Sequence, residues 1–406
     1  MAKRTLSLVM IVIGAALLVI AVLLPSFLVP KLRVIPLDTK SSTVTNIENG
    51  YLLDSGLLAK NEPAADRKDD PRCKDAGADK PEGDAEADKP EGDAEADKPA
   101  EMPLHCFIGE TPLVSNRHVR IQEPADKKVA TMEVGTVVLR DDREEPKNLV
   151  NATVDRITLD RSTAFPVVDP VSTIELNAPK AGGGEDTADI PAFTREGIQY
   201  QFPFGTTKKS FPYFDATALQ TFPIDFVGEE KQDGTTVYKF TMEVEPVNLY
   251  ESQKAHFTQN GRKMTEADKS SLASLRLKFP ASKWGLEGDE EIEMDRYYTN
   301  VRTVRVEPNT GMIVNGTEHI FQFYARDEEE AKDIALGAGR EKEKQERNRT
   351  ALDFVAQWSD ETKANQLEKA KESSKKMTMA GSIAPWILGI IGLLLVIFGI
   401  RMHRKS

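Results

Sequence analysis

The residue types that most often perform catalysis are present, but they are not arranged in a recognisable motif. The five histidines are scattered along the chain, and neither an H-E-x-x-H zinc motif nor a G-x-S-x-G nucleophile motif occurs. Ser373-Ser-Lys-Lys376 fits S-x-x-K, but a lysine-rich segment produces such a match by chance. We therefore expect a protein that is not an enzyme, with no catalytic residue, no metal site and no cofactor.

Cys73 and Cys106 could form a covalent bond. They are the only cysteines, so a four-cysteine zinc site and a scaffold of several disulfides are both excluded. In an oxidising compartment, two cysteines on either side of a flexible insert are suited to form a disulfide, which restricts the unfolded chain. We expect this bond; the alternative is a pair of free thiols.

Aromatic residues are concentrated in one stretch and could line a binding cavity. Of the 17 Phe and 8 Tyr in the chain, more than a third lie between residues 193 and 226, and prolines interrupt the stretch. The simpler interpretation is a hydrophobic core of short strands and turns; the functional interpretation is an apolar cavity for an acyl or prenyl chain. The candidate cavity residues are Tyr200, Phe202, Phe204, Phe211, Tyr213, Phe214, Phe222 and Phe226.

Two apolar runs at the ends of the chain predict transmembrane helices, which would anchor the domain that contains the aromatic stretch. No charged residue lies between Arg4 and Lys31, or between Lys376 and Arg401. Each run exceeds the ~20 residues that a helix needs to cross a bilayer, so we expect transmembrane helices at 5–29 and 378–400. A cleaved signal peptide is the alternative for the first run, but its apolar stretch is too long and has no small-residue cleavage site.

The distribution of charge predicts the orientation of the chain in the membrane, and the net charge excludes nucleic acid as a partner. The chain has 53 Lys+Arg and 65 Asp+Glu, for a formal charge of −12. An acidic protein lacks the basic face of a nucleic-acid-binding protein. The two short tails are basic, which favours the cytoplasm for both termini. We expect a two-pass plasma-membrane protein whose large domain lies outside the cytoplasm.

Between the two spans, we expect one β-rich domain over 32–340 and a helical segment over 341–377. Alternating or β-branched runs predict strands at 128–139, 152–161 and 235–244, and a hairpin around Pro308–Gly311. Segment 341–377 is rich in helix-forming residues, with Leu352, Val355 and Trp358 spaced along one helical face. The predicted fold class is thus a membrane-anchored α+β protein, mainly antiparallel β, with a long C-terminal helix.

An acidic repeat interrupts this domain. Ala78–Glu86 is repeated as Ala87–Glu95, and every unit contains proline and glycine. Such a polar segment buries too little apolar surface to offset the entropy lost on ordering. We expect 61–101 to be a disordered spacer; weak cation binding is the alternative.

Five short segments carry a resemblance to a known family. They are Gly197–Phe204, Phe211–Asp215, Phe226–Glu230, Tyr238–Phe240 and Arg305–Val314. They resemble an actinobacterial family of two-pass envelope proteins, often named the porin PorA family or given as of unknown function. The resemblance implies one span at each end and a role in assembling the lipid and lipoglycan envelope of a mycolic-acid actinomycete. The layout is also distantly similar to the class B scavenger receptors, whose ectodomain encloses a lipid tunnel.

These observations favour a lipid-binding protein over a pore. A membrane-spanning barrel needs many strands with apolar outward faces, whereas the membrane signal here lies in two helices. We therefore expect an envelope protein that binds membrane lipid or a polyprenyl- or acyl-linked glycan. The alternatives are a scaffold that docks membrane proteins of envelope synthesis and, less favoured, a porin-like protein or a glycolipid-processing enzyme.

Overall fold

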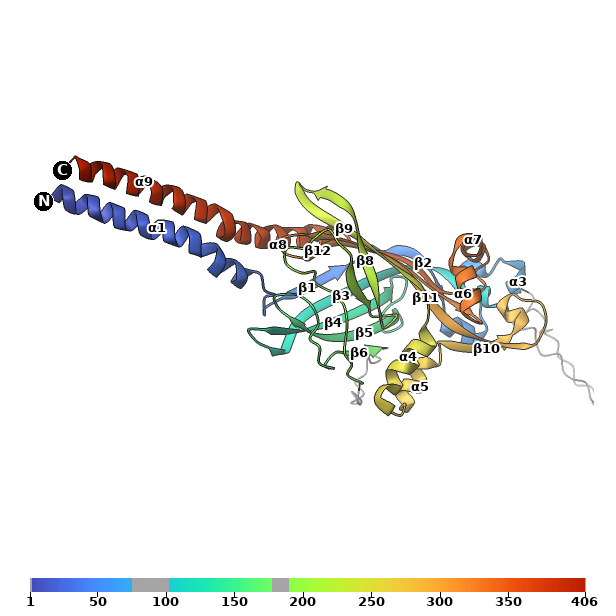
Figure 1. Ribbon diagram of the computed structural model, residues 1–406. Helices are drawn as coiled ribbons and strands as arrows, with labels where there is room; N and C mark the ends of the chain where they lie inside the picture. Colours follow the sequence, from blue (N-terminus) through green and yellow to red (C-terminus); the bar gives the residue numbers. More distant parts are fainter. Residues whose placement is uncertain (1, 75–101, 177–189, 406) are drawn as a thin grey trace, which may run out of the picture.

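The computed structural model describes residues 2–74, 102–176 and 190–405, and it divides into a helical arm and a curved sheet (Figure 1). The arm consists of α1 (Ala2–Leu32) and α9 (Ala384–Arg404), which run side by side so that the two termini lie together at its end. The expected mixed α+β class with an antiparallel sheet and a long C-terminal helix is confirmed, and both apolar runs form helices long enough to cross a membrane.

The sheet contains thirteen strands among the described residues, and all of its strand pairs are antiparallel. The order along it is β6-β5-β4-β3-β2-β13-β12-β11-β9-β8-β7, with β1 paired to β3 and β10 paired to β11. The strands are β1 (Lys40–Val44), β2 (Glu48–Leu53), β3 (Ile108–Ala125), β4 (Val129–Arg140), β5 (Leu149–Asp160), β6 (Thr173–Leu176), β7 (Phe211–Asp215), β8 (Gln220–Gln232), β9 (Thr235–Asn248), β10 (Arg276–Pro280), β11 (Glu291–Glu307), β12 (Met312–Ala325) and β13 (Thr350–Gln357).

The predicted strands and hairpin are confirmed. The runs at 128–139, 152–161 and 235–244 fall within or almost within β4, β5 and β9. β11 and β12 form the hairpin, and Gly311 in its turn has a φ of +70°. A Cβ atom on Gly311 would lie 2.1 Å from the carbonyl oxygen of Phe202, so the turn requires glycine both for its backbone conformation and for space.

The prediction of one helical segment over 341–377 is wrong in its middle. Residues 350–357 form β13, which pairs with β12 on one side and with β2 on the other. Leu352 is buried and Val355 is exposed, which is the alternation of a strand and not a shared helical face. Hydrogen bonding to strands on both sides outweighs the local helix propensity here.

Helices cover the ends of the sheet and connect it to the arm. α8 packs on β12 and β1, where the Thr362 hydroxyl donates to the carbonyl of Val44 and Gln366 donates to the hydroxyl of Ser41. The helices outside the arm are α2 (Ser55–Lys60), α3 (Pro71–Lys74), α4 (Leu249–Thr258), α5 (Glu266–Leu272), α6 (Glu328–Ala335), α7 (Gly337–Glu346) and α8 (Asp360–Thr378), with short 3-10 turns η1 (Ala65–Arg67), η2 (Leu104–Phe107), η3 (Gln259–Gly261) and η4 (Ala281–Trp284).

The start of the expected disordered spacer is ordered, which corrects that prediction for residues 61–74. Backbone hydrogen bonds attach this segment to the rest of the domain: the amide of Ala64 donates to the carbonyl of Cys106 at 2.7 Å. The side chain of Arg67 also donates to the carbonyl of Ile108 at 3.0 Å. The remainder of the predicted spacer, 75–101, lies outside the described residues.

Candidate functional site

Glycines bring the two arm helices into direct contact. The backbones of α1 and α9 approach so closely that a Cβ atom on Gly14 would lie 2.6 Å from the carbonyl oxygen of Gly392. A Cβ atom on Gly399 would lie 3.0 Å from the carbonyl oxygen of Ser7. Near the termini, the Ser7 hydroxyl and His403 Nδ1 are 3.0 Å apart. Small residues at such contacts are how helices pack in an apolar surrounding, where tight packing drives association.

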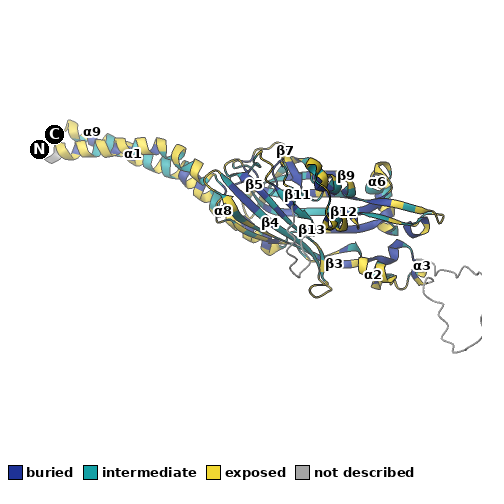
Figure 2. Ribbon diagram, turned by 90° about the horizontal axis from the view of Figure 1, so that it is seen from below, coloured by how far each residue is buried: buried dark blue, intermediate teal, exposed yellow. Residues whose placement is uncertain are grey.

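The remaining surface of the arm is apolar and exposed. Figure 2 shows exposed residues along both helices, in contrast to the buried strands of the sheet. The most exposed large apolar side chains on the arm are Val22 (77%) and Trp386 (73%). A soluble protein rarely exposes a continuous apolar surface of this size, so the arm is the part of the chain suited to enter a membrane.

A short π-helical segment joins the arm to the domain. Residues Met379–Ile383 connect α8 to α9 without interrupting the helical course, and α1 packs against this segment. A Cβ atom on Gly381 would lie 3.1 Å from the side chain of Val29. The arm is therefore held to the sheet through α8 as well as through the chain that follows α1.

The aromatic candidates occupy the interior of the domain. Phe202, Phe211 and Tyr213 are at most 4% exposed and share one cluster with Phe240, whose ring centroid lies 4.8 Å from that of Phe202. Phe214 is buried beside Phe193. The other four are partly buried: Phe222 and Phe226 pack against the cluster around Phe202, and Tyr200 and Phe204 pack against a second cluster that contains Val134 and Ile157.

Two cavities lie elsewhere, and neither is lined by any of the eight aromatic candidates. One, of about 440 Å³, lies among α2, η1, β3 and β4 and has charged walls that include Asp54 and Arg140. The other, of about 730 Å³, lies where α1 meets α8 and is lined by residues such as Leu28 and Lys376.

A buried network of charged residues lies beside the aromatic cluster, and the sequence did not reveal it. Arg195 donates two hydrogen bonds to Asp155, at 2.7 and 2.9 Å, and Tyr200 donates a third at 2.6 Å. Asp155 is 2% exposed, although its alternation with Arg156 in β5 is typical of a solvent-facing strand. The signal was missed because the partner, Arg195, is distant in sequence and lies in a loop.

A second part of the network centres on Arg302 in β11. Its guanidinium lies 2.9 Å from Glu318 and 3.3 Å from Asp215, and Tyr298 donates to Asp215 at 3.1 Å. Burial alone would raise the pKa of Glu318, but the charges of Arg302 and Arg117 outweigh it and lower the pKa to about 2. Glu318 therefore stays ionised at neutral pH, and its ion pair with Arg302 joins β11 to β12.

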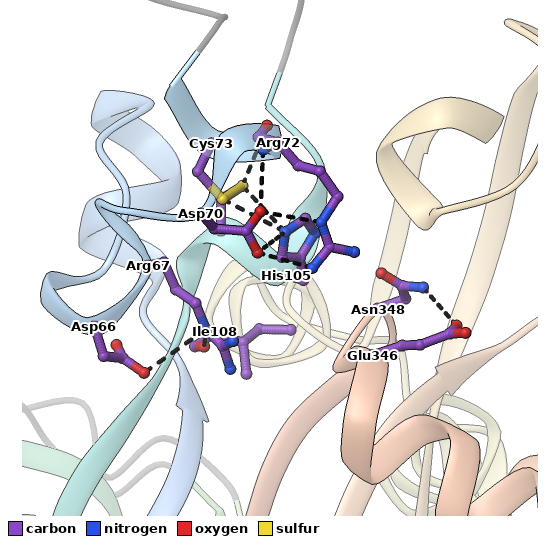
Figure 3. Close-up of polar contacts among 10 residues, drawn as sticks. Asp66, Arg67, Asp70, Arg72, Cys73, His105, Ile108, Glu346 and Asn348 are labelled. Carbon is purple, nitrogen blue, oxygen red and sulfur yellow. Dashed lines mark hydrogen bonds and ion pairs between the residues drawn. A yellow bond between two sulfur atoms is a disulfide. The ribbon is translucent and has the colours of Figure 1, made fainter.

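A disulfide joins Cys73 in α3 to Cys106 in η2 at the end of the domain away from the arm (Figure 3). His105 is 1% exposed, and its Nε2 lies 3.4 Å from the sulfur of Cys73, 3.6 Å from that of Cys106 and 3.4 Å from Oδ2 of Asp70. Arg72 donates to both oxygens of Asp70, at 3.1 and 2.8 Å. Burial, together with the charge of Arg72, lowers the pKa of His105, which keeps the imidazole neutral at pH 7.

Two paired apolar helices are joined through α8 to an antiparallel sheet domain. This arrangement is that of an envelope or membrane protein with one large domain beside its apolar helices. The chain belongs to the Porin PorA family, which it matches over residues 6–401. It is 60% identical over 405 residues to a protein named Porin PorA from Corynebacterium amycolatum, with all of both chains covered. It is 45% identical to a Porin PorA from Corynebacterium resistens, with 99% of this chain and 97% of the relative covered.

The comparisons confirm the expected family and contradict the expected function. Both relatives carry the name of a porin, so the expectation of a lipid-binding protein that is not a porin is wrong. The expectation of a membrane lipid, a lipid-linked glycan or proteins of envelope synthesis as partners is wrong for the same reason. The error came from treating a spanning β-barrel as the one route to a pore. The family name points to a channel protein rather than an enzyme.

Proposed function

We propose that this protein forms a pore in the cell envelope, and that helix pairs from several copies enclose it. The observation that carries the proposal is membership of the Porin PorA family over residues 6–401, because this range includes both arm helices as well as the domain. The full-length similarity to the Corynebacterium amycolatum protein supports it.

The helices are better suited than the strands to contact lipid. Exposed positions along β8 include Asp225, Glu229 and Lys231, and exposed positions along β9 include Glu243 and Glu245. A cationic side chain on the lipid face of a strand costs about 2–4 kcal/mol at the bilayer midplane, and an acidic one somewhat less. The arm has no charged residue between Arg4 and Lys31 or between Lys376 and Arg401. The strands therefore remain in water while the helices cross.

One copy is insufficient for a pore. α1 and α9 are in backbone contact at Gly14 and Gly392, so no lumen exists between them. A water-filled path needs more helices around it, and the exposed apolar faces of the arm are available to pack against other copies. Several helix pairs side by side would leave a central opening below the sheet domains.

We also propose a two-pass topology with both termini in the cytoplasm. The antiparallel pairing of α1 and α9 supports placement of the termini on one side, and the basic tails favour the cytoplasm. Protease added to intact cells freed of their outer layers is then expected to cleave the sheet domain and to spare tags placed at either terminus. Cleavage of the tags with an intact domain would reverse the orientation.

The test of the pore is electrical. Full-length protein, purified in detergent and added to a planar lipid bilayer, is expected to produce discrete conductance steps. Gly392→Leu should abolish them, because a Cβ atom there would lie 2.8 Å from the carbonyl oxygen of Gly14. Gly389→Ala is the matched control on the same helix: its Cβ atom would make an ordinary contact of 3.9 Å with Ala21.

Each outcome is decisive. Steps from the wild type and from Gly389→Ala, but not from Gly392→Leu, support a pore built from the helix pair. Steps that are unchanged in a folded Gly392→Leu variant would place the pore elsewhere in the molecule. Folded wild-type protein that inserts into the bilayer and gives no steps would overturn the proposed function.

A further inference from the structure

The surroundings of the disulfide contain the donor atoms of a metal site. The sulfurs of Cys73 and Cys106 and a ring nitrogen of His105 all lie within 4.8 Å of one another, and all three residues are buried. Asp70 adds a carboxylate oxygen on the same side, 3.4 Å from His105 Nε2, as Figure 3 shows. Two sulfurs, one imidazole nitrogen and one carboxylate oxygen make a four-ligand set of the kind that binds Zn²⁺.

The three distances from His105 Nε2 match tetrahedral coordination. Zinc bonds of about 2.0–2.3 Å, spread at the tetrahedral angle, place neighbouring ligand atoms roughly 3.3–3.8 Å apart. The distances from His105 Nε2 to the two sulfurs and to Asp70 are 3.4, 3.6 and 3.4 Å. Once the disulfide is reduced, the two sulfurs are no longer bonded and can separate to nonbonded contact, which falls in the same range.

The cluster does not depend on the disulfide alone for its position. Cys73 and Cys106 pack in one hydrophobic core with Phe107, Trp284 and Tyr324. Backbone hydrogen bonds hold both short helical turns: the amide of Cys73 donates to the carbonyl of Asp70 at 2.9 Å, and the carbonyl of Cys106 accepts from Ala64 at 2.7 Å. Reduction therefore leaves the four donor groups close together.

The charges also suit a divalent cation. A metal-bound imidazole is neutral and a metal-bound thiol is a thiolate. Asp70 supplies a carboxylate that Arg72 holds through two hydrogen bonds. Two thiolates, one carboxylate and the neighbouring Arg72 guanidinium sum to two negative charges, which a divalent ion neutralises. His105 Nδ1 has no hydrogen-bond partner in the described part of the chain, so the affinity should be below that of a site whose histidine is supported on both nitrogens.

We propose that the reduced form of this protein binds a zinc-type divalent cation through Cys73, Cys106, His105 and Asp70, so that a metal replaces the disulfide as the cross-link between α3 and η2. This inference is independent of the proposed pore. The site is open to the metal only when the S–S bond is broken. The two states are therefore mutually exclusive: either the disulfide or the metal joins the two ends of the intervening segment.

Replacement of the disulfide by the metal begins with a two-electron reduction of the S–S bond. An external dithiol gives two electrons to the disulfide, the S–S bond breaks, and the two sulfurs take up two protons as the dithiol closes to its own disulfide. Binding of the cation then displaces both protons from the thiols as two Zn–S bonds form. After removal of the metal, an external disulfide takes two electrons from the two thiolates and is reduced to two thiols, which restores the S–S bond.

The test uses the full-length protein in detergent, with Co²⁺ as a spectroscopic substitute for Zn²⁺. After reduction by a phosphine and removal of the reductant, one Co²⁺ per chain is expected, with thiolate-to-cobalt charge-transfer absorption and the strong visible bands of a tetrahedral site. Zn²⁺ should displace the cobalt and remove the colour. Oxidised protein should show none of these signals.

Variants identify the ligands. His105→Ala and Asp70→Asn should each weaken Co²⁺ binding about tenfold or more, the scale found when even a supporting residue of a metal site is lost. Two matched controls should bind like the wild type: His118→Ala, an exposed histidine on β3, and Asp69→Asn, the neighbouring carboxylate, which is fully exposed.

Three results would overturn the proposal. The first is reduced, folded protein whose two thiols react with a maleimide but give no charge-transfer band. The second is a His105→Ala variant that binds Co²⁺ as tightly as the wild type. The third is loss of the circular dichroism of the sheet on reduction without recovery when the metal is added, since the cluster would then not survive opening of the disulfide.

Discussion

At the scale of single residues, buried ion pairs as well as packed aromatic side chains stabilise the interior of the domain. Arg195 is 3% exposed and Asp155 is 2% exposed, and the pair shares Tyr200 and Gln199 as further partners. Removal of one member of a buried pair leaves the other charge without compensation, which typically costs 3–5 kcal/mol. The network is thus sensitive to single substitutions in a way that surface ion pairs are not.

Arg195→Met tests this network. We expect the free energy of unfolding to fall by about 3–5 kcal/mol, because Asp155 would remain buried without its charged partner. Chemical denaturation of the detergent-solubilised protein measures the change. Lys344→Ala is the control, since its partner Glu341 is exposed and an exposed pair of this kind contributes little to stability. Equal effects of the two substitutions would contradict the role given to the buried pair.

The lowered pKa of His256 in α4 predicts how the free energy of unfolding depends on pH. Burial, followed by the charges of Arg262 and Arg195, lowers its pKa from 6.5 to about 4 in the folded protein. Between these two values the unfolded chain binds a proton that the folded protein does not, so stability rises with pH over this window. The contribution of His256 is complete above pH 6.5, and about 3 kcal/mol of it is lost by pH 4.

The corresponding measurement is the free energy of unfolding at a series of pH values from 4 to 7. His256→Gln, which has no titrating group, should flatten the curve in this window relative to the wild type. Glu318 is not expected to obscure the result: its pKa of about 2 places its loss of stability between the ordinary glutamate value of 4.5 and pH 2. An unchanged slope in the variant would contradict the assignment to His256.

At the scale of elements, the contact between β2 and β13 depends on a glycine. A Cβ atom on Gly50 in β2 would lie 2.7 Å from the carbonyl oxygen of Asp353 in β13. Gly50→Ala should therefore push the two strands apart and cost about 1–3 kcal/mol, the usual range for overpacking. Thermal unfolding followed by circular dichroism measures the loss.

Gly135→Ala in β4 is the matched control for this prediction. No atom lies within 4 Å of the position that its Cβ would take. Alanine in place of glycine within a strand should then be neutral or stabilise by about 0.5–1 kcal/mol, because the unfolded chain loses freedom. If both glycine substitutions destabilise equally, the close approach of β2 and β13 is not the cause.

The elements also show what the sequence could and could not predict. The two arm helices and the β11–β12 hairpin were predictable because their signals are local: uninterrupted apolar residues in one case, alternation around a glycine turn in the other. β13 was not, because Thr350–Gln357 lies in a helix-forming context and becomes a strand through pairing with the distant β2 and β12. The ion pair of Asp155 was missed for the same reason: its partner is remote in sequence.

At the scale of the whole molecule, charge predicts selectivity. The chain has a formal charge of −12 at pH 7, and the arm contributes no acidic residue between Arg4 and Lys31 or between Lys376 and Arg401. The excess negative charge thus lies between the two arm helices in the sequence, and residues 75–101, which are outside the described residues, carry a net −8 of it (11 Asp and Glu against 3 Lys). Negative charge raises the local concentration of cations within about one Debye length, which is about 10 Å in 0.1 M salt and about 3 Å in 1 M salt.

We therefore expect the pore to prefer cations in dilute KCl, and the preference to weaken as salt is raised. Reversal potentials across a bilayer with a KCl gradient measure this ratio. Lowering the pH to about 4 should reduce the preference, since exposed carboxylates begin to protonate there. A preference for anions in dilute salt would show that the acidic domain does not determine the ions near the pore.

The place of β2 in the sheet has a consequence for biosynthesis. β2 joins the two halves of the sheet by pairing with β13, where Leu52 lies opposite Leu352. The chain emerges from the ribosome N-terminus first. β2 can pair with β3 early, but β13 is synthesised only after most of the chain. A nascent chain halted before Thr350 would therefore expose an open edge of β2, which is a site for pairing with other chains.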